Sequence, residues 1–222
     1  MPPPSTNRLV IILTLVCMGL FAFAPELDLS VSRMFFRDGG FVGAATATGD
    51  AARRLFWDAP YLVLAGFLVA YALRRLGRLR RGPDGRAIVF LVATLALGPG
   101  LLLNGALKEN SGRPRPVLSK EFGGAWDFRP WYDFRGQCET NCSFASGEAG
   151  ASAWTLAPAL LAPPPARPYA VAAALLLTAA TAALRIAYGG HYLSDVTLAA
   201  LFTILVVLAG YRWYSRGSKT WI

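Results

Sequence analysis

A histidine, an aspartate and an arginine stand at fixed spacing near the end of this chain. His191 is the only histidine among 222 residues, and Arg185 lies six positions before it and Asp195 four positions after it, in the segment RIAYGGHYLSD. A neutral imidazole can attack phosphorus when a carboxylate holds its other nitrogen. Arginine suits phosphate because its planar guanidinium bonds two oxygens at once. The three residues together predict a phosphoryl-transfer site.

Two earlier segments supply other groups that phosphoryl transfer needs. KENSGRPRP carries Lys108 and, seven residues later, Arg115, while SFASGE carries Ser146, Gly147 and Glu148. Lysine adds a point charge, and the backbone amides at a helix start bind anions. Because Ser146-Gly147 stands where an apolar helix is expected to begin, we expect this turn to contact phosphate together with the cationic side chains.

Each residue also has an ordinary structural interpretation. Arg185 near a helix end can anchor to lipid head groups, and His191 in a Gly-Gly loop can be a surface residue. Asp195 or Ser194 can cap the following helix, and Glu148 is favourable near a helix start because of the helix dipole alone. The functional interpretation therefore depends on whether the three segments reach the same place.

The apolar segments predict a membrane protein. Hydrophobic residues make up 55% of the chain, more than a soluble domain of this length needs, and a spanning helix takes about 20 mostly apolar residues. We therefore expect an all-α integral membrane protein, a six-helix bundle with short loops, forming one domain over residues 1–222. The six candidate spans are roughly 8–24, 59–75, 87–107, 147–162, 168–187 and 194–212.

The charged residues divide unequally between the two sides of this bundle. With the N-terminus inside, the inner segments, which include residues 74–86 and Lys219, hold 11 bases and one acid, and the outer segments hold 11 bases and 12 acids. Cytoplasmic loops carry an excess of Lys and Arg, so residues 74–86 are expected in the cytoplasm and the long loop 108–146 outside. All three chemical segments then reach the outer face.

Two alternatives remain for the charged and terminal segments. Residues 74–86 can instead form a patch for anionic lipid or nucleic acid, although the topology explains the charge without a nucleic-acid partner. Ala22-Phe23-Ala24 resembles a signal-peptidase site, but Pro25 is unfavourable after the cut and MPPPSTNR carries one basic residue. We expect a retained first span.

The first outer loop and the cysteines complete the expected architecture. Aromatic and basic residues within 25–58 favour a short amphipathic helix on the membrane, with a plain anchored loop as the alternative. Cys138 and Cys142 lie in the outer loop, where an oxidising compartment lets them pair; two free thiols are the alternative. One histidine and two nearby cysteines make no credible metal-ligand set, so neither a metal nor another cofactor is expected.

The spacing resembles that of the type 2 phosphatidic acid phosphatase superfamily, which includes the vanadium haloperoxidases. Its motifs are K-x6-R-P, P-S-G-H and S-R-x5-H-x3-D, and the first and third fit Lys108 to Arg115-Pro116 and Arg185, His191 and Asp195. The resemblance implies that His191 becomes phosphohistidine, that Asp195 orients it and that no metal is needed. The residues that it implies hold phosphate are Lys108, Arg115, Ser146, Gly147 and Arg185.

Three positions depart from the superfamily motifs. Ala145 replaces the proline of the second motif, Leu184 the serine of the third, and Glu148 the histidine that protonates the leaving oxygen. A glutamic acid can take that role only when it is protonated. Glu148 is therefore the candidate general acid, and it can act as one only if its carboxyl group is protonated.

A narrower resemblance is to the lipid A 4'-phosphatase branch. Its members carry paired cysteines before the second motif and an acidic residue in place of the histidine, as CETNCSFASGEA does here, and PELDLSVSRMFF is also similar. The resemblance implies a phosphatase acting on a membrane lipid, in the bacterial inner membrane, with its active site facing the periplasm. We infer no obligatory protein partner.

Other functions remain open at this point. The substrate can instead be phosphatidic acid, phosphatidylglycerophosphate or undecaprenyl pyrophosphate. A lipid phosphotransferase passes the phosphoryl group to another lipid hydroxyl, and a non-catalytic lipid-binding protein results if Glu148 cannot act as the acid. Release of inorganic phosphate separates the phosphatases from the last two.

Overall fold

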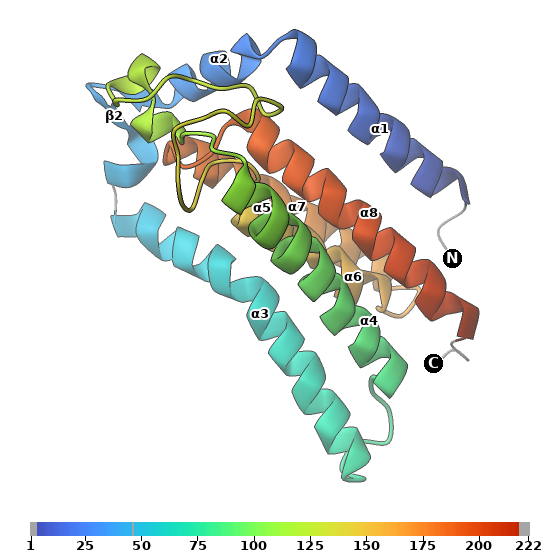
Figure 1. Ribbon diagram of the computed structural model, residues 1–222. Coiled ribbons are helices and arrows are strands. Elements are labelled where there is room, and N and C mark those ends of the chain that lie inside the picture. Colours follow the sequence, from blue (N-terminus) through green and yellow to red (C-terminus); the bar gives the residue numbers. More distant parts are fainter. Residues whose placement is uncertain (1–3, 46, 218–222) are drawn as a thin grey trace.

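Long helices dominate the computed structural model, which describes residues 4–45 and 47–217. Among these residues, five helices are long and apolar enough to cross a membrane, and Figure 1 shows them running alongside one another. The expectation of a helical, multi-pass membrane protein is thereby confirmed; Lys219 and residues 1–3 lie outside the described part. The helices are α1 (Pro4–Phe23), α3 (Ala47–Arg75), α4 (Gly85–Leu95) with its π-helical continuation η2 (Ala96–Lys108), α7 (Arg167–Ala187) and α8 (Leu193–Gly217).

The fourth expected span, 147–162, differs from the others. It forms two short helices, α5 (Gly147–Trp154) and α6 (Leu156–Leu160), whose residues are all buried. The helix breaks at Thr155, whose hydroxyl donates to the Ser152 carbonyl at 2.6 Å, and Pro158 lacks the backbone N–H that would continue it. Helices α3, α7, α8 and η2 surround α5, so this apolar segment is covered by protein and is shorter than a spanning helix.

The first outer loop is more ordered than expected. Helix α2 (Glu26–Met34) follows α1 directly and buries Asp28 and Ser32, so it packs on the bundle, where it contacts α8. A small hairpin of β1 (Phe36–Arg37) and β2 (Gly40–Phe41) and the short helix η1 (Val42–Ala45) come next. The hairpin is a small departure from an all-α fold. Residues 47–58 are no separate surface helix, because they form the first turns of α3.

The long loop 108–146 folds over the end of the bundle where α2 lies, and the turn between α3 and α4 lies at the opposite end (Figure 1). Two short helices, η3 (Pro116–Leu118) and η4 (Lys120–Phe122), interrupt the loop. The segments that carry the expected chemistry therefore meet at one end of the molecule.

The wider turns of η2 direct polar groups toward this end. Pro99 lies inside η2, and the Asn104 amide donates to the Pro99 carbonyl at 2.8 Å, five residues back. Such π-helical turns occur frequently at functional sites. They bring Asn104 and Lys108 to the wall of a cavity at this end of the bundle.

Candidate active site

A cavity of about 460 Å³ opens at this end of the bundle. Every expected phosphate-binding or catalytic side chain is on its wall or directly behind it. Ser146 and Asp195 are fully buried behind the wall, and the backbone N–H of Ser146 donates to the Asp195 carbonyl at 3.3 Å. The lining residues are Asp50, Arg53, Arg54, Trp57, Asp58, Asn104, Lys108, Arg115, Asn141, Gly147, Glu148, Arg185 and His191.

The His191 imidazole is held by its Nδ1 atom. Only 1% of the residue is exposed, and Nδ1 lies 2.7 Å from the Ser143 carbonyl oxygen. Because a carbonyl oxygen only accepts hydrogen bonds, Nδ1 carries the proton and Nε2 keeps its lone pair. This is the tautomer that a nucleophilic histidine requires.

Asp195 acts mainly through the segment that holds the imidazole. Its Oδ2 is 3.8 Å from Nδ1 of His191, farther than the Ser143 carbonyl. The same oxygen accepts from the Ser143 hydroxyl at 2.5 Å and from the backbone N–H of Tyr192 at 2.8 Å. The carboxylate therefore fixes Ser143 and the start of α8, and through them the orientation of His191.

The charge state of His191 follows from its burial. Burial lowers its pKa to about 4, and the positive charges of Arg185 and Lys108 act in the same direction, against the effect of the Asp195 carboxylate. The imidazole is therefore neutral near pH 7, so its lone pair is available.

Arg185 is placed to receive an anion. The residue is 3% exposed, and its Nε has no hydrogen-bond partner among the described residues. A Cβ on Gly190 would lie 2.3 Å from the Arg185 Nη2 atom, so the glycine gives the guanidinium its room. A buried donor without a partner is costly, and a bound phosphate would supply the acceptor.

The turn before α5 brings its backbone close to the cavity. The Ser146 hydroxyl caps α5 by accepting from the Ala149 N–H at 3.3 Å, as N-cap serines do. A Cβ on Gly147 would lie 2.4 Å from Asn104 Oδ1, which explains the glycine. The first amides of α5 thus border the cavity, where they can bind an anion.

Arg113 is a buried residue that the sequence did not single out. Its guanidinium bonds Asp28 at 2.7 Å, the Asp195 carboxylate and the Ser194 hydroxyl at 2.8 Å, while its Nε donates to the Arg129 carbonyl at 2.7 Å. Burial lowers the pKa of Arg113, but Asp195 and Asp28 outweigh this effect and raise it. Arg113 therefore ties α2 to the first turn of α8.

Arg113 was missed because the repeat Arg-Pro-Arg-Pro gives two arginines in one segment. The motif spacing selects Arg115, which reaches the cavity, and gives no role to Arg113. Asp28 was not predicted because it was expected in the first outer loop, 25–58, whereas the structure places it in α2. The available signal was its place in PELDLSVSRMFF, a segment that also resembles the lipid A 4'-phosphatase branch.

Arg53 is a second contributor that the motifs do not include. Its Nη2 lies 3.0 Å from Glu148 Oε1, and its guanidinium is 5.9 Å from the centre of the Tyr188 ring. The Tyr188 hydroxyl donates to Asp50 at 2.7 Å. The first turns of α3 thus form a charged wall facing α5 and α7.

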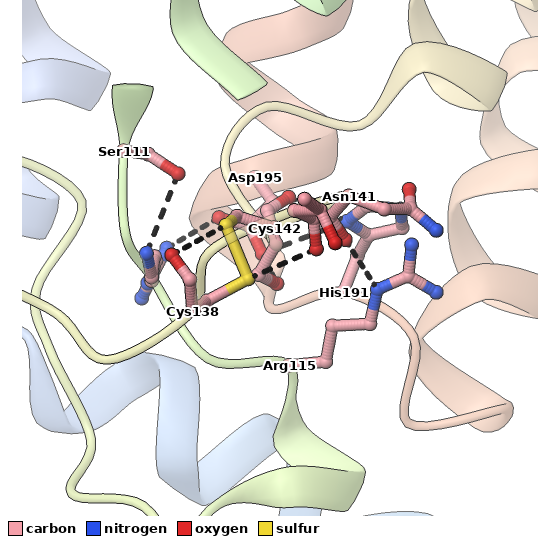
Figure 2. The surroundings of a disulfide bond; sticks show 10 residues. Ser111, Arg115, Cys138, Asn141, Cys142, His191 and Asp195 are labelled. Carbon is pink, nitrogen blue, oxygen red and sulfur yellow. Dashed lines mark hydrogen bonds and ion pairs between the residues drawn. A yellow bond between two sulfur atoms is a disulfide. The ribbon is translucent and has the colours of Figure 1, made fainter. Parts of the chain in front are cut away.

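The two outer cysteines are joined by a disulfide bond. Cys138 and Cys142 have their Cα atoms 5.6 Å apart, and Figure 2 shows the bond beside Arg115, Asn141, His191 and Asp195. Within the closed loop, the Asn141 carbonyl accepts from Arg115 Nε at 3.1 Å. Ser143, which holds the imidazole, follows directly. The disulfide therefore braces the segment that carries contacts to both His191 and Arg115.

Alkylation of the denatured, unreduced protein is expected to modify one of its three cysteines, Cys17, and reduction is expected to expose the other two. Intact-mass spectrometry counts the adducts. Cys142→Ser serves as the control, because it frees Cys138 and should show two adducts without reduction. Three adducts on the unreduced wild-type protein would contradict the pairing.

Within residues 4–45 and 47–217, no group of three or more His, Cys, Asp and Glu side chains is arranged to hold a metal ion. The cavity wall does carry several cationic side chains, which can bind an oxyanion.

A helical membrane bundle with a buried histidine and several cations at one end defines a class of membrane phosphatases. A family model of the PAP2 superfamily matches residues 87–219, more than half of the chain. The chain belongs to this superfamily, which confirms the resemblance seen in the motifs.

Curated relatives point to one branch of it. The chain is 34% identical over 208 residues to "Lipid A 4'-phosphatase" of Rhizobium leguminosarum, covering 86% of this chain and 89% of that protein. It is 33% identical to the Rhizobium etli protein of the same name, covering 86% and 80%. A Francisella tularensis subsp. novicida protein, again "Lipid A 4'-phosphatase", is 36% identical over 54% of each chain. No solved structure matches the chain.

Proposed function

We propose that this chain is a membrane lipid phosphatase that hydrolyses a phosphate monoester of lipid A, as a single membrane-embedded domain. The supporting observation is the buried, neutral His191 imidazole, whose Nδ1 is held by the Ser143 carbonyl at 2.7 Å on the wall of a cavity with several cationic side chains. The names of the relatives support lipid A as the substrate.

The reaction proceeds in two displacements. His191 Nε2 attacks phosphorus, the N–P bond forms, and the bond from phosphorus to the lipid oxygen breaks as Glu148 gives that oxygen a proton. Water then attacks the phosphohistidine and gives a proton to the Glu148 carboxylate. The N–P bond breaks, its electron pair returns to Nε2, and inorganic phosphate leaves.

The surrounding charges stabilise the phosphoryl group. Lys108, Arg115 and Arg185 come from three different segments of the wall and can contact different phosphate oxygens. The amides at the start of α5, beginning at Gly147, add neutral donors. Because transferring phosphoryl groups carry charge on their equatorial oxygens, positioned cations and amides lower the barrier.

A substrate panel tests this function. Purified protein is incubated with bis-phosphorylated lipid A, phosphatidic acid, phosphatidylglycerophosphate and undecaprenyl pyrophosphate, and free phosphate and product mass are measured. We expect the largest phosphate release from lipid A, with a product lighter by one phosphate group. Loss of lipid phosphorus without free phosphate would indicate a phosphotransferase. If none of the four lipids loses phosphate, the result would contradict an enzymatic function.

The proposed site faces the periplasm from the bacterial inner membrane. In a Cys17→Ala background, a cysteine at Arg80 is expected to resist a membrane-impermeant thiol reagent in intact cells, while one at Lys120 reacts. Both positions are solvent-exposed, so the difference reports the side of the membrane. Labelling of position 80 from outside would overturn this topology.

Glu148→Gln is expected to slow hydrolysis of a lipid phosphate by roughly 10²- to 10⁴-fold, because an amide does not donate the required proton. An aryl phosphate has a good leaving group that needs little protonation, so its hydrolysis should slow much less. Initial rates on both substrates give the comparison, with the exposed Glu139→Gln as control. Equal slowing on both substrates would assign Glu148 a binding or capping role.

A further inference from the structure

Glu148 occupies cationic partners that a phosphate would also use. Its Oε1 atom lies 3.0 Å from Arg53 Nη2 and 3.4 Å from Arg185 Nε, and only 9% of its side chain is exposed. Guanidinium groups bind carboxylates and phosphates through the same planar donors. The carboxylate therefore lies where phosphate oxygens would make their contacts.

Other titratable groups reach Glu148 from each neighbouring segment. Lys108 at the end of η2 and Arg115 in the following loop interact electrostatically with it, as do Arg185 on α7 and Tyr61 on α3. Asp50 and Asp58 line the same cavity. The Glu148 carboxylate therefore lies among the cations that a phosphate would meet.

We propose that Glu148 is the resident anion of the phosphate site, and that a bound phosphate monoester takes over Arg53 and Arg185 so that Glu148 becomes protonated only when substrate is in place. The proposal rests on the proposed function. It makes Arg53 a phosphate-binding residue outside the three motifs.

The exchange is balanced in charge and protons. A phosphate dianion that bonds Arg53 and Arg185 removes the cationic partners of the carboxylate and places a negative charge beside it. Both changes disfavour a second anion, so the carboxylate takes one proton from the solvent. The resulting carboxylic acid can then donate this proton to the leaving oxygen. Glu148 is therefore protonated only when a phosphate monoester is bound.

The contacts of Arg185 and Arg53 with Glu148 are of a kind that a phosphate can replace. Arg185 Nε has no hydrogen-bond partner among the described residues, and its distance of 3.4 Å from Glu148 is that of a loose contact. Arg53 is 43% exposed along its side chain, so it can turn toward an entering head group without breaking a packed core.

Tungstate binding tests the proposal without any turnover. Tungstate is a tetrahedral dianion at neutral pH, so it brings no proton of its own. Calorimetric titration of the purified protein in buffers of different ionisation enthalpy measures the protons taken up. We expect about one proton per tungstate bound by the wild type, none by Glu148→Gln, and wild-type uptake by the control Glu139→Gln.

The role of Arg53 has its own measurement in the same titrations. Arg53→Gln is expected to weaken tungstate binding by roughly 10- to 100-fold, the usual loss for a hydrogen bond to a charged group. Arg37→Gln removes an exposed arginine from the β1–β2 hairpin and should bind as the wild type does. Unchanged affinity in Arg53→Gln would overturn its place in the phosphate site.

The outcomes separate this inference from the proposed function. Tungstate binding without proton uptake, or uptake that persists in Glu148→Gln and thus belongs to another group such as His191, overturns the inference and leaves the phosphatase proposal standing. Failure of tungstate to bind or to inhibit phosphate release overturns the phosphate site itself, and the inference with it.

Discussion

Replacing His191 by alanine is expected to abolish phosphate release, by a factor on the order of 10⁶ as for other nucleophile deletions, while the protein stays folded. Among the described residues, the imidazole hydrogen-bonds the Ser143 carbonyl, and its other nitrogen is the proposed attacking atom. Rates come from free phosphate, and folding from the thermal melting curve in detergent. Retained turnover, or phosphate trapped on another residue of the wild type, would refute the role of His191.

Asp195→Asn and the pH profile give the matched controls for the nucleophile. Asp195→Asn should retain residual activity, because orientation contributes roughly 10²- to 10⁴-fold. Burial lowers the His191 pKa to about 4, so the neutral form persists well below pH 7. We therefore expect kcat/KM to fall on the acid side only as the pH approaches about 4, a limb absent from any residual activity of His191→Ala.

Arg113→Ala is expected to cause the largest loss of stability that a single substitution in this network can produce. It leaves the Asp28 and Asp195 carboxylates, which are 1% and 0% exposed, without their cation. Removing one partner of a buried ion pair costs about 3–5 kcal/mol. We expect a markedly lower melting temperature and loss of phosphate release, since Asp195 then no longer fixes Ser143 and the start of α8.

Two further variants test whether the guanidinium geometry of Arg113, and not its positive charge alone, is required. Arg113→Lys keeps the positive charge but lacks the fork that reaches Asp28, Asp195 and Ser194 together, so it should melt nearer the wild type and still release phosphate slowly. Arg135→Ala removes an exposed arginine paired with Asp133 and should alter neither measurement. Full activity in Arg113→Lys would show that the charge alone suffices.

The membrane-spanning helices were predictable where they form long apolar runs in the sequence. Apolar runs located α1, α4 with η2, α7 and α8 to within a few residues, because these helices must expose an apolar surface to lipid. The same signal did not reveal that 147–162 is buried on all sides and broken at Thr155, since a protein-covered helix and a lipid-facing one are equally apolar. It also missed that α3 begins before its apolar part, in the polar turns that carry Arg53.

The site was predictable where a single segment sets the spacing. Arg185, His191 and Asp195 lie in one short stretch whose local geometry brings them together. The partners contributed by distant segments were not predictable in the same way. Asp28, Arg113 and Arg53 reach the site only through tertiary packing. The Ser143 carbonyl is a backbone group, which every residue type has, so the sequence does not single it out.

The Asp28–Arg113–Asp195 network also constrains how the protein can be made. Asp28 emerges early from the ribosome, Arg113 near the middle of synthesis and Asp195 near its end, yet all three must meet for the carboxylate that supports His191 to be neutralised. A nascent chain that has inserted only its earlier helices therefore lacks both the proposed nucleophile, His191, and its electrostatic support. The membrane is exposed to a working enzyme only after α8 has been inserted, so truncated translation products cannot attack its lipids.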